Sequence, residues 1–175
     1  MRKLILLNLF LIFGCSLNHD LLSQNTKDSF TIFLVRHSEK DLTTQNYSDP
    51  PLSTCGHQRA KFLDTYLDDF ELDAIYSTNF KRTKSTANPT AISKSLSIHL
   101  YSPNDLEAFS NFLLNQKQDA LVVGHSNTTA VLAGLLSNQK LEAFDESIYN
   151  RIYKVEVGEN TVSFDLIISQ FDCQN

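Results

Sequence analysis

The chain lacks three features that would each indicate a particular class of protein. Its 15 Lys and Arg against 20 Asp and Glu give a formal net charge of −5, which argues against general nucleic-acid binding because that function needs a basic surface. Its longest apolar run, Leu4–Phe13, is too short to span a bilayer. The spacing of His, Cys and Asp matches no metal site, so we expect no metal and no cofactor. What remains is a chain of 175 residues that can bury a single core.

The N-terminus is distinct from the rest of the chain. A short basic start precedes the apolar run, so residues 1–14 are predicted to be a secretory signal that takes no part in the fold. The run ends in Gly14-Cys15, which resembles a bacterial lipoprotein signal and implies lipidation of Cys15; the alternative is a plain secretory peptide. Residues 15–29 are polar and predicted to be a linker. We therefore expect an exported, membrane-anchored bacterial lipoprotein, on the periplasmic or cell-surface side, with one domain at 30–175.

Strand-like and helix-like patterns alternate along that domain. Short apolar runs of strand character are separated by longer runs with apolar residues at helical spacing. The predicted strands are 30–35, 74–77, 97–101 and 120–123, the predicted helices 53–68, 79–93, 103–116 and 127–136, and the predicted hairpin strands 151–157 and 161–169. This order indicates an α/β three-layer sandwich: a mostly parallel central sheet with helices on both faces, and a C-terminal β-hairpin.

Two of the predicted strands end in a histidine. The first ends in Arg36-His37, and the fourth ends in Gly124-His125, where glycine allows close backbone approach. The carboxyl ends of parallel strands form the edge at which α/β sheets bind ligands. Arg82 follows another strand, in the first turn of a helix, where free N–H groups favour anions. A guanidinium fork suits a phosphate and an imidazole can act as a nucleophile, so this edge is predicted to be a phosphate site.

Four motifs then occur in order. Residues 36–38 (RHS) match an Arg-His-Gly motif with Ser in place of Gly, and residues 52–60 match the pattern LS-x-x-G-x-x-x-A. Residues 76–87 match the pattern YSS-x-x-x-R-x-x-x-T-A, and residues 123–126 match V-x-H-x. Together they resemble the histidine phosphatase superfamily and its compact phosphohistidine-phosphatase branch. The resemblance implies a phosphoglycerate mutase-like fold and metal-free hydrolysis through a phosphohistidine. The implied partner is a small phosphorylated substrate or a phosphoprotein.

The residue types suggest roles at this edge. His37 is the candidate nucleophile and His125 the candidate second imidazole, which donates to the phosphoryl group; these are also the family's roles at the matching positions. Arg36 and Arg82 would clamp the phosphoryl oxygens. Two neighbours of the histidines are further candidates for substrate binding, Ser38 and Asn127. The long insertion that usually builds a sugar-phosphate pocket in this family is absent between residues 90 and 119. The resemblance therefore implies a small, open site and favours a phosphatase over a mutase.

The proton donor for the leaving group is less defined. Asp105 and Glu107 are the candidates, although each also suits the first turn of a helix. Glu39 is a third candidate. Because the acid is unsettled and Ser38 replaces a glycine, we keep an alternative: a non-catalytic, membrane-anchored module that binds a phosphorylated ligand.

Two cysteines lie within the predicted domain, Cys55 and Cys173. An oxidising compartment would allow them to form a disulfide. Nothing in the sequence places them close together, so the favoured expectation is two unpaired thiols.

Overall fold

A computed structural model describes residues 27–173. The predicted signal at 1–14, the lipidation site Cys15 and most of the predicted linker lie outside the described residues. Within 27–173, none of the helices combines the length and the apolar character needed to cross a bilayer.

A six-stranded sheet forms the middle of the molecule, in the order β3-β2-β4-β1-β5-β6. Four strands are parallel to one another, namely β1 (Phe30–Arg36), β2 (Ala74–Ser77), β3 (Ile98–Leu100) and β4 (Ala120–Gly124). The other two, β5 (Arg151–Val157) and β6 (Val162–Ile168), form the C-terminal hairpin and pair antiparallel. The predicted mostly parallel sheet with a terminal hairpin is confirmed.

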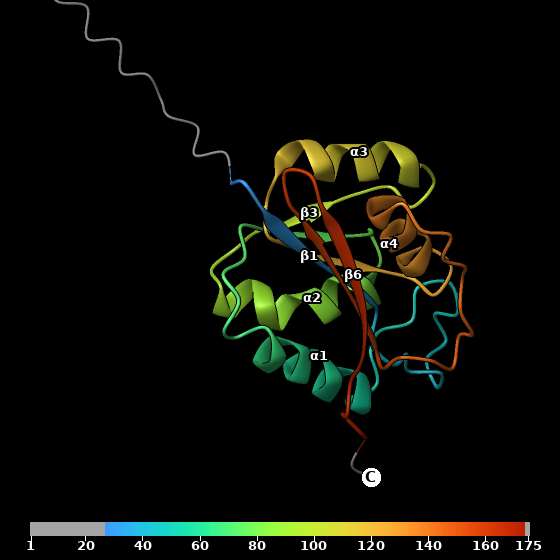
Figure 1. The fold of residues 1–175 in the computed structure, drawn as a ribbon. Coiled ribbons are helices and arrows are strands. Elements are labelled where there is room, and N and C mark those ends of the chain that lie inside the picture. The colour runs from blue at the N-terminus through green and yellow to red at the C-terminus, as the bar shows by residue number, and fades with distance from the viewer. Residues whose placement is uncertain (1–26, 174–175) are drawn as a thin grey trace, which may run out of the picture.

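Helices cover both faces of the sheet (Figure 1). On one face lie α1 (Thr54–Tyr66) and α2 (Lys81–Ser93), and on the other lie α3 (Leu106–Gln116) and α4 (Thr129–Ser137). Alternate residues of β1 therefore enter two cores: Phe33 and Val35 pack toward the first pair of helices, Ile32 and Leu34 toward the second. A strand buried on both faces is continuously apolar, which is why this strand was visible in the sequence.

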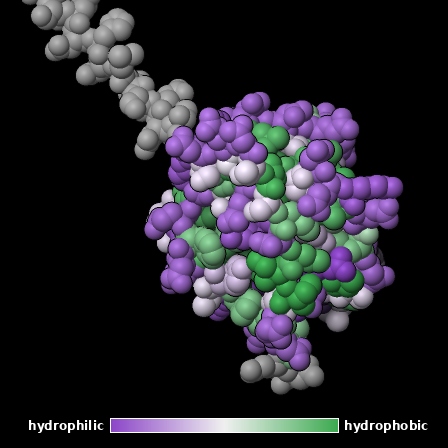
Figure 2. All heavy atoms as spheres, in the orientation of Figure 1, coloured by the Kyte–Doolittle hydropathy of each residue, from purple (hydrophilic) through white to green (hydrophobic). Residues whose placement is uncertain are grey.

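The α3 and α4 layer leaves part of the hairpin uncovered. Figure 2 shows apolar side chains gathered over the lower part of this hairpin. The outermost strand, β6, carries large apolar side chains that remain half-exposed, namely Val162, Leu166 and Ile168.

Side-chain caps start two of the helices, α1 and α3. Ser53 caps α1, because its Oγ accepts a hydrogen bond from the Gly56 N–H at 3.1 Å. The predicted start of the third helix at 103 was wrong, because Asp105 caps it instead: its Oδ1 accepts the Ala108 N–H at 2.9 Å. Pro103 therefore lies in the preceding turn.

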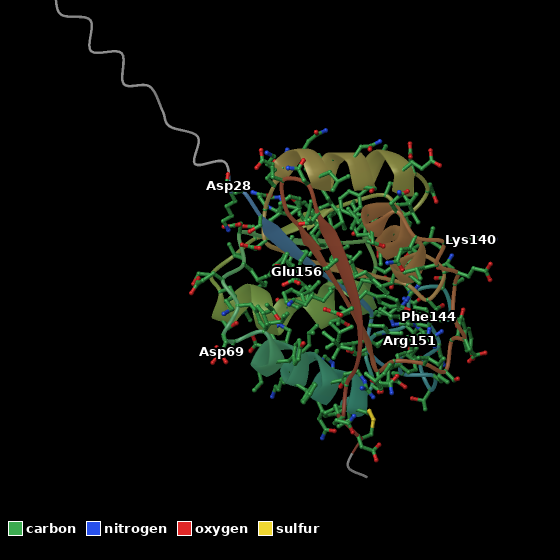
Figure 3. The ribbon with its side chains drawn as sticks, viewed as in Figure 1. Asp28, Asp69, Lys140, Phe144, Arg151 and Glu156 are labelled. Carbon is green, nitrogen blue, oxygen red and sulfur yellow. A yellow bond between two sulfur atoms is a disulfide. The ribbon has the colours of Figure 1, made fainter. Side chains whose placement is uncertain are left out.

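The two cysteines of the domain are bonded to each other, so the expectation of unpaired thiols was wrong. Cys55 and Cys173 lie 118 residues apart in sequence, but their Cα atoms are 5.4 Å apart. The yellow bond near the C-terminus in Figure 3 is this disulfide. The chain leaves β6 and returns past α1, where the Phe171 ring lies 5.4 Å from that of Phe62. Only this tertiary path brings the two cysteines together.

Candidate active site

The sheet brings the two predicted histidines to one edge. β1 and β4 are adjacent and parallel with Arg36 opposite Gly124, so His37 and His125 follow side by side. The His37 N–H donates to the Gly124 carbonyl at 2.9 Å, and the two imidazole centroids are 5.5 Å apart.

Two glycines permit close packing around this edge. A Cβ on Gly124 would lie 2.7 Å from the Tyr101 hydroxyl oxygen and 2.9 Å from Thr128 Oγ1, so the predicted close approach is confirmed. A Cβ on Gly56 would collide with the backbone oxygen of Glu39. The second sequence motif therefore holds the start of α1 against the loop that follows the first histidine.

The hydrogen bonds of His37 fix its tautomer. Its Nδ1 lies 2.8 Å from the Ser38 carbonyl oxygen. Because a carbonyl can only accept, Nδ1 carries the proton and donates it. Nε2 is then left with a free lone pair, as a nucleophile requires.

The tautomer of His125 follows from a chain of hydroxyl groups. Thr83 Oγ1 donates to the Thr78 carbonyl at 2.8 Å, which uses its only proton. Thr83 Oγ1 must therefore accept from Thr78 Oγ1, at 3.1 Å, and Thr78 Oγ1 must accept from His125 Nε2, at 2.9 Å. His125 thus carries its proton on Nε2, and its Nδ1 remains for a ligand.

The two predicted arginines hold their planes against aromatic rings. The Arg36 guanidinium carbon lies 4.2 Å from the Tyr149 ring centroid, and that of Arg82 lies 4.4 Å from the Phe80 ring centroid. Arg36 also donates to the carbonyls of the segment before β5, including that of Ile148 at 3.1 Å.

Each arginine keeps unused donor capacity. Within residues 27–173, the buried Nε atoms of Arg36 and Arg82 find no hydrogen-bond partner. The two guanidinium groups also line the same cavity, where their positive charge suits an anionic ligand.

The electrostatics favour neutral imidazoles. Burial is the main cause that lowers the pKa of His37 to about 3, and the charge of Arg36 lowers it further against the opposing hydrogen bond to the Ser38 carbonyl. Burial followed by the charges of Arg82 and Arg36 lowers the pKa of His125 to about 4. Both rings are therefore neutral at neutral pH, and a phosphate dianion would offset the positive charges around them.

These groups line one open cavity of about 400 Å³. Its lining residues are Arg36, His37, Lys40, Phe80, Arg82, Pro103, Asn104, His125, Ser126, Asn127, Thr128 and Glu146. The cavity is small and open, as the missing insertion predicted, and Asn127 lines it as expected.

Two charged residues of this cavity were missed by sequence reasoning. Lys40 follows the first motif, and Glu146 lies in the irregular segment between α4 and β5. Their side chains form an ion pair with Lys40 Nζ 3.2 Å from Glu146 Oε2, and the pair with Lys40 lowers the pKa of Glu146. A carboxylate within a phosphate cavity was not expected there, because nothing in the local sequence marks residue 146.

Four predicted residues do not reach the cavity. Asp105 is engaged as the helix cap and Glu107 is exposed in the first turn of α3, so the two candidate acids serve the helix end rather than the site. Glu39 is held by Arg59, with a shortest N–O distance of 2.6 Å. Ser38 is buried behind the site, where its N–H donates to Thr86 Oγ1 at 2.9 Å.

Solved structures share this fold. The protein histidine phosphatase SixA complexed with tungstate matches with a TM-score of 0.69 and 20% identity, over 80% of this chain and 97% of that one. The alpha-ribazole phosphatase from Shigella flexneri matches with a TM-score of 0.62 and 17% identity, over 80% and 96%. A mycobacterial glucosyl-3-phosphoglycerate phosphatase matches with a TM-score of 0.61 and 11% identity, over 82% and 100%. At these identities the likeness establishes the fold, which is that of phosphoglycerate mutase-like α/β proteins.

Part of the sequence also matches a family model. The model of the histidine phosphatase superfamily (branch 1) matches residues 32–102, a span that contains Arg36, His37 and Arg82. Over these residues the chain is similar to the hydrolases of that superfamily. No curated protein matches the chain.

Proposed function

We propose that the protein is a metal-independent phosphatase that hydrolyses a phosphomonoester or a phosphohistidine through a phosphoenzyme on His37. The observation that carries the proposal is the Nδ1–Ser38 hydrogen bond, which leaves Nε2 as the free atom of a neutral, buried imidazole. Arg36 and Arg82, with Lys40, supply the positive charge that the phosphoryl group needs.

The first step transfers the phosphoryl group. His37 Nε2 attacks phosphorus with its lone pair, the P–N bond forms, and the bond to the leaving group breaks with its electron pair going to the leaving atom. Arg36 and Arg82, which both line the cavity, hold the equatorial oxygens. His125 Nδ1 takes a proton when the dianion offsets the surrounding charge, and donates a hydrogen bond to a phosphoryl oxygen. Water then attacks phosphorus: the new P–O bond forms, the P–N bond breaks with its electron pair returning to Nε2, and the water's proton passes to solvent as phosphate is released.

The cavity offers the leaving group a poor general acid. Among the described residues, Glu146 is the one carboxylate that lines the cavity, and its pair with Lys40 lowers its pKa. It can act as an acid only if substrate binding breaks that pair. We therefore expect faster turnover of substrates whose leaving group needs little protonation, such as aryl phosphates and phosphohistidine, than of alkyl phosphates.

The test is a rapid-quench experiment with a radiolabelled aryl phosphate in the presence of a chelator. We expect an acid-labile, base-stable phosphoenzyme in the wild type and none in His37→Ala. A matched control is His57→Ala, because His57 is exposed on α1 and does not line the cavity. A phosphoenzyme of unchanged amount in His37→Ala would exclude His37 as the nucleophile.

A second candidate is a non-catalytic module that binds a phosphorylated ligand. The ion-paired state of Glu146 favours it, because the cavity then has charge to bind phosphate and a poor acid. The two functions differ in turnover: a binder shows saturable protection by inorganic phosphate in thermal unfolding, but releases no phosphate from an aryl phosphate.

We also propose that the protein is exported and anchored to the membrane by a lipidated Cys15. The basic and apolar start and the Gly14-Cys15 pair support this, and so does the disulfide between Cys55 and Cys173, because disulfides persist in oxidising compartments. Cys15→Ser should move the exported protein from the membrane fraction to the soluble fraction. Wild-type protein that is recovered in the cytoplasm with Met1 intact would contradict export.

A further inference from the structure

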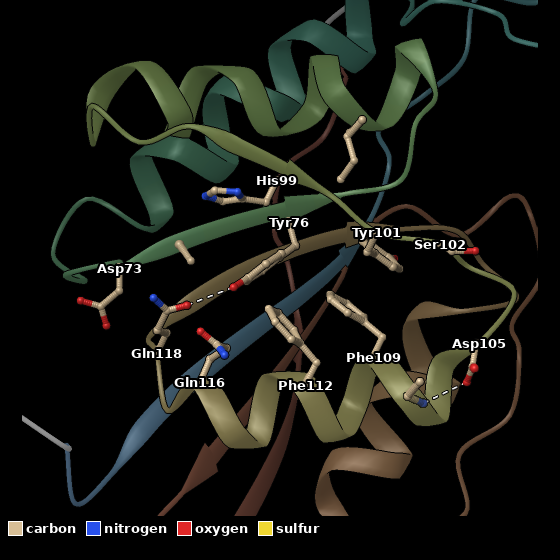
Figure 4. A pocket seen from close by; sticks show the side chains of 13 residues that line it. Asp73, Tyr76, His99, Tyr101, Ser102, Asp105, Phe109, Phe112, Gln116 and Gln118 are labelled. Carbon is tan, nitrogen blue, oxygen red and sulfur yellow. Dashed lines mark hydrogen bonds between the residues drawn. The ribbon is translucent and has the colours of Figure 1, made fainter. Parts of the chain in front are cut away.

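A second cavity lies beside the candidate active site. It has a volume of about 600 Å³ and runs between the face of β2 and β3 and helix α3 (Figure 4). We call it the aromatic groove and define it by five rings that line it: Tyr76, His99, Tyr101, Phe109 and Phe112.

One turn separates the aromatic groove from the phosphate cavity. Ser102 and Asp105 line the groove, whereas the two residues between them, Pro103 and Asn104, line the phosphate cavity. The two cavities therefore share a wall that is four residues long. A ligand whose phosphoryl group lies against His37 needs only to cross this turn to enter the groove.

The groove is built to receive an apolar group. The rings of Tyr101 and Phe109 stack at 4.1 Å, and that of Phe112 meets that of Tyr76 edge-on at 5.8 Å. Phe112 nevertheless remains 42% exposed. Exposed apolar surface of this kind, continuous with a polar site, is typical of a place where a ligand binds.

The polar groups at the far end of the groove are already paired. The Tyr76 hydroxyl donates to Gln118 at 3.0 Å, and Asp73 pairs with Lys27 at 2.5 Å. Among residues 27–173, no Lys or Arg lines the groove, so it does not suit a second phosphate. Its free surface therefore selects for an uncharged aromatic or aliphatic side chain.

The edge of the sheet favours a polypeptide as the source of that side chain. Within the part of the chain that the structure describes, β3 is the terminal strand of the sheet and pairs on one side only, with β2. Its residues His99 and Leu100 line the groove and lead into the shared turn. An extended peptide can pair with such an edge while its side chains enter the neighbouring pockets.

We propose that the substrate is a phosphorylated polypeptide that binds in extended form, with its phosphoryl group in the phosphate cavity and an apolar side chain in the aromatic groove. The inference rests on the proposed phosphatase function. A phosphorylated metabolite that fills the phosphate cavity alone would leave the groove empty.

The test compares a small probe with phosphopeptides on the full-length protein. Para-nitrophenyl phosphate reports on the phosphate cavity alone. The peptides are octapeptides that contain phosphotyrosine or phosphohistidine, and in each a single Phe occupies a different position flanking the phosphorylated residue. The reference peptide has polar residues at all of these flanking positions. We expect one Phe position to raise kcat/KM at least tenfold over the reference. An extended chain advances roughly 3.3 Å per residue, so the optimum should be confined to one or two positions.

The variant Phe112→Ser tests whether the aromatic groove binds the Phe side chain of the peptide. It should abolish the advantage of the Phe peptide and leave kcat/KM for para-nitrophenyl phosphate within twofold, since Phe112 is partly exposed and does not line the phosphate cavity. Leu135→Ser is the matched control, because Leu135 is 38% exposed on α4 and lines neither cavity. It should keep both activities.

The outcomes separate the two proposals. If para-nitrophenyl phosphate is not hydrolysed, the phosphatase function itself fails. If it is hydrolysed but no peptide is, or the Phe position and Phe112→Ser have no effect, the polypeptide proposal is overturned while the phosphatase stands. If Phe112→Ser instead impairs only a bulky small substrate such as naphthyl phosphate, the groove serves a small apolar phosphate and the polypeptide proposal is also overturned.

Discussion

Replacing Thr78 by valine tests whether the hydroxyl chain behind His125 contributes to catalysis. Thr78 is fully buried, and its Oγ1 accepts the proton of His125 Nε2 at 2.9 Å. Valine has nearly the same shape but accepts no hydrogen bond. A neutral His125 can respond by moving its proton to the other nitrogen. An imidazolium that donates to the phosphoryl group needs protons on both nitrogens, so its Nε2–H would be left unpaired.

The magnitude follows from that unpaired donor. A buried N–H without a partner costs about 1–3 kcal/mol. Because the cost is incurred when His125 is charged, it adds to the barrier, and each 1.36 kcal/mol is tenfold in rate. We expect Thr78→Val to lower kcat for an aryl phosphate roughly 5- to 150-fold, with a smaller change in KM.

The assay is steady-state hydrolysis with a matched control. Thr90→Val is the control, because Thr90 is also fully buried and its Oγ1 has no hydrogen-bond partner within the described part of the chain. It should keep kcat within twofold. Thermal unfolding of both variants checks that they fold. A folded Thr78→Val with unchanged kcat would refute the role assigned to the hydroxyl chain.

Three further predictions concern charge, pH and the disulfide. Arg82→Lys keeps the charge but loses the planar fork on Phe80, so kcat/KM should fall at least tenfold, about 1.4 kcal/mol; unchanged kinetics would exclude the clamp. The unfolded chain takes up protons on histidine near pH 6.5, whereas folded His37 and His125 stay neutral to about pH 3 and 4. The free energy of unfolding should therefore fall as the pH drops below about 6.5, and urea titrations at pH 7.5 and 5 should show a smaller difference in a His37→Gln, His125→Gln variant. Cys173→Ser opens a loop of 118 residues and should destabilise the protein by about 2–4 kcal/mol in urea unfolding; equal stability with and without a reductant in the wild type would contradict this.

The sequence by itself determined the sheet and the sites at its edge. β1 and β4 are buried on both faces, so each is a continuous apolar run, and each run ends where a polar residue begins. Because the carboxyl ends of parallel strands lie at one edge, the positions of His37 and His125 followed from the local pattern alone.

Tertiary structure decided which of the remaining polar residues reach that edge. Asp105 satisfied every local rule for an acid near the site, but those rules also describe a helix cap, and the backbone N–H of Ala108 takes its carboxylate. Glu146 has no local signal at all. It enters the cavity because Arg36 binds the carbonyl groups of its segment and thereby folds that segment over the site.

The disulfide and the two tautomers were also decided only in three dimensions. Cys55 meets Cys173 because the chain returns past α1 after the last strand, a path that no sequence spacing encodes. The free nitrogen of His37 depends on a carbonyl that faces Nδ1, and that of His125 depends on Thr78, which follows β2, and on Thr83 in α2. Sequence patterns act through neighbours along the chain, whereas the proton on each imidazole is set by neighbours in space.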